Sequence, residues 1–163
     1  MSSTVLDGIV LEFLQHRLMV SAASRSADHV PSVARGIGYQ LERDGCRLAV
    51  FLCRTHAEQL LADVRATGLV AVVFSEPHTH RSLQLKGSDA RVGPLQQRER
   101  AWLPVYADTV VEELTPLGYP ETVIRTLVEA DPAQVLAIRF TPDSAFAQTP
   151  GPRAGAPLGG SRP

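Results

Sequence analysis

Seven basic or polar side chains fall near the ends of the strands that this sequence predicts, and their chemistry suits an anion. Arginine offers a forked donor for phosphate, lysine offers a point charge, and the amides at a helix N-terminus favour an anion. Charge-assisted hydrogen bonds of about 1.5–3 kcal/mol each would together hold a phosphorylated ligand. The same residue types also suit an ordinary surface that faces solvent, so both interpretations stay open. The seven residues are Arg35, Thr55, His56, Arg81, Ser82, Gln84 and Lys86.

The stretch VVFSEPHTHRSLQLKG contains four of these residues. Because successive side chains of a strand point to opposite faces, Leu83 and Leu85 share one face, and Ser82, Gln84 and Lys86 share the other. The alternation therefore predicts a strand with one buried side and one polar side. That polar side is either solvated or one wall of a site for a polar ligand.

Familiar catalytic motifs are missing from the sequence. It has no G-x-S-x-G, H-E-x-x-H or C-x-x-C run, no G-x-G-x-x-G after a strand and no Walker A motif. His78 and His80 are two residues apart and would share a face of a strand, but no third ligand is evident. We therefore expect no metal, and the sequence names no catalytic residue.

Helical and strand patterns alternate along the chain, and they must position these side chains. We expect an amphipathic helix over 3–17 and a capped helix over 55–68 with Thr55 and Glu58 as a capping box. Helices interrupted by Pro104, Pro116 and Pro120 are expected over 94–131. Strands are expected over 18–25, 32–42, 47–53, 69–75, 80–93 and 133–143.

Short strands with helices at the edges indicate an α+β barrel rather than a doubly wound sheet. We expect residues 1–147 to form a single domain with a helical insertion at about 95–131. Residues 148–163 are a tail rich in proline and glycine, which is either disordered or held extended against another surface.

Composition excludes several classes of protein. The 163 residues are 44% apolar and 20% charged, with a net charge of −1, which does not suit a nucleic-acid binder. Neither an apolar run of about 20 residues nor a basic region before the first apolar residues is present. We expect a cytoplasmic protein that binds neither nucleic acid nor membrane.

Four segments together resemble a known family. They are VPSVARGIG, the strand–helix–strand run DGCRLAVFLCRTHAEQLLADVRATGLVAVVFS, the strand RSLQLKG and the ending FAQTPGPRAG. In order and spacing they are similar to the flavin-binding split-barrel proteins related to pyridoxamine 5'-phosphate oxidase. RSLQLKG stands in the place of that family's Arg-Gln-x-x-x-x-Gly strand.

The resemblance implies an antiparallel six-stranded split β-barrel with flanking helices, and a homodimer that binds FMN in clefts along the subunit interface. It places Arg35 beside the flavin or its phosphate, and Thr55 and His56 in the phosphate-binding region. Ser82 stands where a glutamine usually contacts the flavin, with Gln84 on the same face and Lys86 as a further candidate.

Two departures limit what the resemblance implies. The family's Ser-Arg-Lys run is replaced by Arg54, Thr55 and His56, and the arginine-rich C-terminal segment of the true oxidase is absent. We therefore do not expect oxidation of pyridoxamine phosphate. The leading hypothesis is an FMN-dependent oxidoreductase with an unknown small-molecule substrate. The alternatives are the same fold binding F420 or haem, with His56, His78 or His80 as the axial ligand, and a non-catalytic dimeric binding module.

Overall fold

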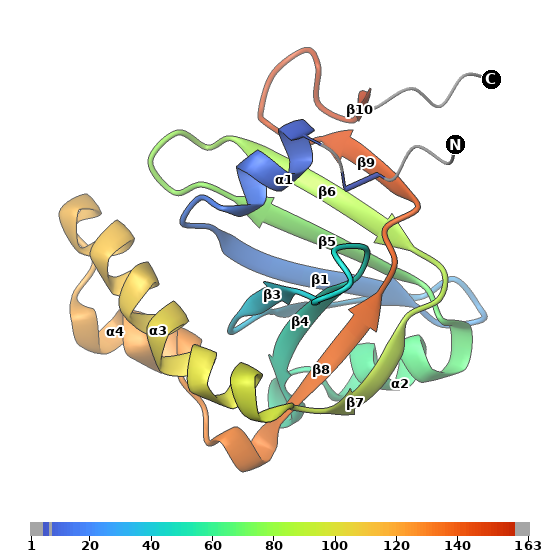
Figure 1. Cartoon of the computed structure of the whole chain (residues 1–163), viewed down its shortest axis with the longest axis horizontal. Helices are drawn as coiled ribbons and strands as arrows, with labels where there is room; N and C mark the ends of the chain where they lie inside the picture. Colours follow the sequence, from blue (N-terminus) through green and yellow to red (C-terminus); the bar gives the residue numbers. More distant parts are fainter. Residues whose placement is uncertain (1–4, 7, 159–163) are drawn as a thin grey trace.

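Alternating apolar side chains build two antiparallel sheets, between which most of the core lies (Figure 1). The computed structural model describes residues 5, 6 and 8–158. The ends of the expected N-terminal helix and of the tail, at residues 1–4 and 159–163, lie outside this description, as does residue 7. The α+β class and the antiparallel pairing are confirmed.

The larger sheet has six strands in the order β10-β9-β6-β5-β1-β2, and every pair with a register is antiparallel. The expected strands over 18–25 and 69–75 appear as β1 and β5. The strands are β1 (Met19–Arg25), β2 (Pro31–Arg35), β5 (Val70–Ser75), β6 (Ser82–Gly87), β9 (Ser144–Ala147) and β10 (Pro157–Leu158).

The smaller sheet has four strands in the order β3-β4-β8-β7. β4 is buried along its whole length, because it is a central strand of this sheet. The strands are β3 (Tyr39–Leu41), β4 (Leu48–Cys53), β7 (Arg91–Pro94) and β8 (Val135–Phe140). The described chain thus has ten strands rather than the expected six, in two sheets that are not joined into one closed barrel.

Two long segments run from one sheet into the other and account for two of the four additional strands, and β9 and β10 near the C-terminus are the other two. The expected strand over 32–42 is divided into β2 and β3 at Gly36–Gly38, where Gly36 N–H donates to Val20 O at 2.8 Å and Ile37 N–H donates to Phe51 O at 2.8 Å. The expected strand over 80–93 is divided into β6 and β7 just after Gly87. At both glycines a Cβ would lie 2.6 Å from a buried side chain, Val20 at the first and Phe140 at the second.

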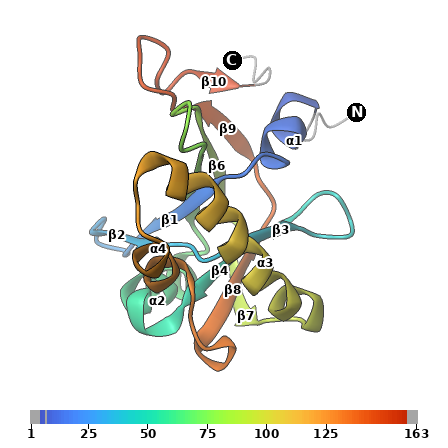
Figure 2. The same cartoon turned by 90° about the vertical axis from the view of Figure 1, so that its left-hand side faces the viewer.

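Helices cover the ends and one outer face of the sheets. α1 lies near β9 and β10 at one end of the molecule, and α2 lies at the other end (Figures 1 and 2). α3 covers the outer face of the four-stranded sheet, where Leu103 packs with Phe51 and Ala137 in a second core cluster. The helices are α1 (Gly8–Leu14), α2 (Glu58–Thr67), α3 (Gln97–Leu114) and α4 (Glu121–Val128).

Two expectations about helix boundaries are wrong. Pro104 does not interrupt a helix but lies inside α3, on its exposed side, where water can solvate the carbonyl that loses its partner. Thr55 does not cap α2, which begins at Glu58 after the 3-10 turn η1 (Arg54–His56) and has no side-chain cap. Thr55 Oγ1 lies 3.3 Å from Cys53 Sγ instead.

Part of the expected tail folds back onto the larger sheet. β10 pairs with β9, and the segment between them bonds to the start of β6. Gln148 N–H donates to Ser82 O at 2.8 Å, and Ser82 N–H donates to Thr149 Oγ1 at 3.0 Å. As far as Leu158, the tail is therefore neither fully extended nor free of structure: it turns at residues 151–155 and returns as β10 beside β9.

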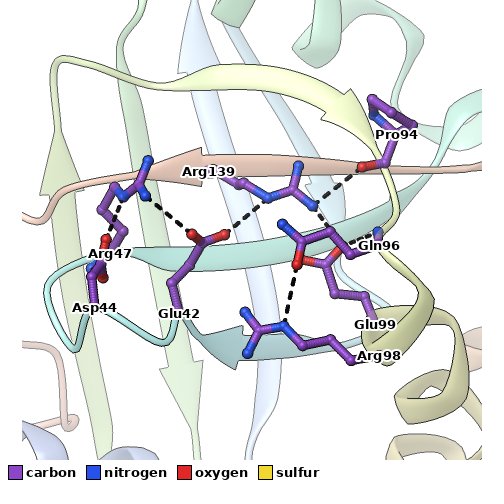
Figure 3. A network of polar contacts seen from close by, with 8 residues as sticks. All are labelled: Glu42, Asp44, Arg47, Pro94, Gln96, Arg98, Glu99 and Arg139. Carbon is purple, nitrogen blue, oxygen red and sulfur yellow. Dashed lines mark hydrogen bonds and ion pairs between the residues drawn. The ribbon is translucent and has the colours of Figure 1, made fainter.

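A buried ionic network fixes the first turn of α3 on the smaller sheet (Figure 3). Arg139 on β8 donates to Glu99 Oε2 at 2.5 Å and to Glu42 Oε1 at 2.9 Å. Glu99 is fully buried, and the same Oε2 accepts the backbone N–H of Gln96 at 2.6 Å as part of a capping box. Arg47 adds a more exposed bond to Glu42 at 3.4 Å. One arginine therefore joins β8, the end of β3 and α3.

The close contact at Gly36 predicts that a single added methyl group lowers the stability of the fold. Gly36→Ala places its Cβ against Val20, so we expect the free energy of unfolding to fall by about 1–3 kcal/mol in urea denaturation. Gly8→Ala is the control, because nothing lies within 4 Å of a Cβ at Gly8. Equal stability of the two variants would show that the corner does not need a glycine.

Removal of Arg139 leaves the buried Glu99 without a cation and Glu42 with only the half-exposed Arg47. We expect Arg139→Met to lower the free energy of unfolding by about 3–5 kcal/mol. Arg47→Met removes the half-exposed cation on the same Glu42 and is the matched control, for which we expect a much smaller loss. Similar losses for both variants would contradict the central role of Arg139.

Candidate functional site

The outer face of the six-stranded sheet brings together the predicted residues of β2 and β6. One row across the sheet runs through Arg35, Ser21, Val73 and Gln84, because these residues are register partners on successive strands. Their side chains point away from the core, which lies on the other face. β2 and β6 are three strand spacings apart, so the Cα atoms of Arg35 and Gln84 lie about 14 Å apart.

The floor between Arg35 and Gln84 is made of small side chains. Ser21 and Val73 lie in their row, and Ala23 and Ala71 lie in the next row, which ends at Lys86. All four floor residues are only partly buried. Small side chains leave room above the backbone, so a flat ligand or a second protein surface can approach this sheet closely. The sequence patterns of β1 and β5 contain this floor, but it is recognised only once the strand order is known.

The three polar side chains of β6 lie on this face, as the alternation predicts, and each already has a contact within the chain. Ser82 Oγ lies 2.8 Å from Ser75 Oγ, and Gln148 Nε2 donates to Gln84 Oε1 at 3.3 Å. Lys86 Nζ lies 4.8 Å from the centroid of the Phe146 ring. These contacts fix the direction of the polar side chains along the wall of the face.

Lys86 also lines a cavity of about 490 Å³ at one end of the face. Arg25 at the end of β1 and His29 in the β1–β2 turn contribute further basic groups, and Ala23 and Ala71 contribute apolar floor. Asp143, the acidic residue of this lining, accepts hydrogen bonds from Ser88 Oγ at 3.1 Å and Ser144 Oγ at 2.8 Å. The cavity therefore places further basic side chains at the end of the face that carries Lys86.

Arg35 ends β2 at the corner before β3, whereas Thr55 and His56 belong to η1, which follows β4. Phe51 bonds to both Ile37 and Gly38, so β4 ends beside this corner and leads directly into η1. Arg35, Thr55 and His56 are all exposed. Arg54 Nη2 donates to Gln134 Oε1 at 3.0 Å, and among the described residues no hydrogen bond or ion pair joins Arg35 to Thr55 or His56.

Arg81 is the predicted residue that the structure places apart from the others. It precedes β6 and its guanidinium lies 5.3 Å from the centroid of the Phe13 ring of α1, on the side of the sheet that carries Leu83. Its immediate role is to cover an apolar helix, since long basic side chains can pack along apolar surface and keep the charge in water.

Neither a membrane span nor a metal cluster is found in the described part of the chain. No helix there is long and apolar enough to cross a membrane. Over the same residues, no group of three or more His, Cys, Asp or Glu side chains is arranged to hold a metal ion. His78 pairs with Glu113 Oε2 at 3.0 Å rather than with His80.

Comparison with solved structures relates the fold to flavin-binding and F420-related proteins. A protein described as F420 reductase is 18% identical, with a TM-score of 0.52 over 82% of this chain and 93% of the other. A pyridoxamine 5'-phosphate oxidase-related, FMN-binding protein from Nostoc punctiforme is 10% identical, with a TM-score of 0.51 over 93% and 88%. A variant of HupZ from Group A Streptococcus is also 10% identical, with a TM-score of 0.51 over 87% and 98%.

These similarities confirm the resemblance read from the sequence at the level of the fold, since the chain shares the split-barrel arrangement of these proteins. No model of a known protein family matches the chain, and no curated protein sequence matches it either. At such low identity, the ligand of any one relative cannot be transferred by similarity alone, and the function must be argued from this chain's residues.

Proposed function

We propose that this protein binds FMN on the outer face of its six-stranded sheet and acts as a flavin-dependent oxidoreductase. The observation that carries the proposal is the row from Arg35 to Gln84, with small side chains between two polar ends. A flavin is a flat ring system joined to a phosphate, so it needs a small-residue floor and a separate anion site. The face offers both.

Arg35, Thr55 and His56 would hold the phosphate at the Gly36 corner. Arg35 can donate two parallel hydrogen bonds to it, and the hydroxyl of Thr55 can donate a third. Gln84 and Ser82 would lie along the ring edge, where amide and hydroxyl groups donate or accept hydrogen bonds. Lys86 adds positive charge at the far end of the face. FMN, when bound, supplies the redox chemistry, and these side chains bind and orient it.

The same face is our candidate for a homodimer interface. It is lined by small, partly buried residues, and Val33, two residues before Arg35 on the same strand, is 73% exposed. A second copy packed on this face would shield the ring from water, and each flavin would then lie between two subunits. The proposal therefore predicts a particle of twice 17.6 kDa by light scattering, and a monomer at all concentrations would contradict it.

Flavin binding is tested first with the protein as purified. We expect FMN to be released on denaturation, or else added FMN to be bound with quenching of its fluorescence. Arg35→Gln should weaken FMN binding by about 10- to 100-fold, because one charge-assisted hydrogen bond contributes about 1.5–3 kcal/mol. Arg43→Gln, at an exposed position in the β3–β4 turn, is the control and should bind FMN like the wild type.

Two other results would redirect the proposal. If F420 binds more tightly than FMN in the same titration, the second candidate holds, which the likeness to an F420 reductase supports. A Soret band on addition of haem, lost on His56→Ala, would favour haem at the same corner. Absence of binding for all three cofactors would leave the face as the interface of a non-catalytic dimeric module and would refute the proposed oxidoreductase.

A further inference from the structure

The cavity of about 490 Å³ at the Lys86 end of the outer face has features that a flavin alone does not use. Its size lies within the range of about 300–1,000 Å³ that is usual for small-molecule sites. It opens where β1 and β6 end and where β5 and β9 begin, because Ala23, Ala71, Lys86 and Ser144 are register partners in one row. The cavity therefore lies over four neighbouring strands.

Two permanent cations line this cavity from the two strands that flank β5. Arg25 ends β1 and Lys86 lies near the end of β6, two strand spacings away, so their Cα atoms are about 12 Å apart. Lys86 is exposed and Arg25 is half-buried. The long side chains of both residues can therefore reach one small group that lies between them.

Neither of these cations is neutralised by a carboxylate of the chain. Arg25 Nη1 donates to the carbonyl oxygen of Ser26 at 3.3 Å, and Lys86 Nζ lies 4.8 Å from the centroid of the Phe146 ring. Both partners are uncharged, and over residues 5, 6 and 8–158 neither cation forms an ion pair, whereas Arg139 is bonded to two carboxylates. The charges of Arg25 and Lys86 are therefore available to an anion in the cavity.

The acidic residue of the lining has other partners. Asp143 Oδ2 accepts the hydroxyl of Ser88 and Asp143 Oδ1 accepts the hydroxyl of Ser144. The lining thus holds two permanent cations, Arg25 and Lys86, and one carboxylate. One further carboxylate, brought by a ligand, would balance these charges. A phosphate dianion would exceed them and would be repelled by Asp143.

The rest of the lining is small or apolar. Ala23 and Ala71 form a floor that is only partly buried, and Leu69 and Pro31 add apolar surface at the rim. His29, exposed in the β1–β2 turn, adds a ring N–H. An apolar group laid on this floor would be removed from water, which is favourable in proportion to the area covered. The lining therefore suits an organic anion with an apolar body better than an inorganic ion.

We propose that this cavity binds a small organic monocarboxylate that has an apolar body, such as an aromatic acid. The carboxylate accepts hydrogen bonds from the guanidinium of Arg25 and the ammonium of Lys86, and the body lies on Ala23 and Ala71. The next row of the face contains Gln84, so the acid lies beside the position proposed for the flavin. Its role as the substrate rests on the function proposed above, whereas its binding does not.

Benzoate is a suitable probe, and benzamide is its matched control because the two have nearly the same size and only benzoate is charged. The full chain, labelled with ¹⁵N, is titrated by NMR without added FMN in a buffer free of carboxylate and phosphate. We expect benzoate to shift the amide signals of Ala23, Ala71 and Ser88 with a Kd on the order of 1 mM. Benzamide should bind about tenfold more weakly, since it cannot form charge-assisted hydrogen bonds as an acceptor anion.

Arg25→Gln and Lys86→Gln test the two cations, with Arg43→Gln at an exposed position of the β3–β4 turn as the control variant. We expect each cavity variant to bind benzoate about tenfold more weakly and Arg43→Gln to bind it like the wild type, with equal thermal unfolding midpoints as a check on folding. Lys86 is the only lysine of the sequence, so a ¹³C-methyl label on lysine side chains reports on this cavity alone and should shift with benzoate.

Equal affinity for benzoate and benzamide, or equal benzoate binding by either cavity variant and Arg43→Gln, would overturn the proposal. So would tighter binding of inorganic phosphate than of benzoate in the same titration. Benzoate binding by a protein that binds no FMN would refute the flavin function and leave the monocarboxylate site standing. FMN binding by a protein whose amide signals do not respond to benzoate would do the reverse.

Discussion

The close approach of backbone and buried side chains at two sheet-to-sheet crossings is the constraint on which the rest of this structure depends. At Gly36 a hydrogen atom stands where a Cβ would overlap Val20, and at Gly87 the same is true for Phe140. Because the chain can bend there, β2 leads into β3 and β6 leads into β7. The two sheets are therefore linked by continuous segments and enclose the main core cluster.

The same crossings explain where polar side chains can gather. Arg35 is the last residue of β2 before the first crossing, and the end of β4 is bonded to that crossing through Phe51. Gly36 and Gly38 have no side chain at this corner, so the backbone there can approach Val20 and Phe51 closely.

The sequence predicts local patterns well and long-range consequences poorly. The alternation at Leu83–Lys86 was sufficient to place Ser82, Gln84 and Lys86 on one face, because the period of a strand is a local property. The position of Arg81 against Phe13 depends on where α1 packs, which no local pattern contains. Pro104 was expected to end a helix, but the buried stripe Leu103, Tyr106, Ala107 and Val110 outweighs one missing hydrogen bond.

Buried polar groups distinguish the two sides of this molecule. On the side of the six-stranded sheet, polar side chains are exposed or bonded to neighbours of the same sheet, so a ligand there would compete with water for them. Under α3, by contrast, Arg139 joins two carboxylates, while Gln40 and Trp102 are left without partners. Because one arginine bonds carboxylates on two separate elements, α3 cannot shift relative to β3 and β8 without leaving a buried charge unpaired.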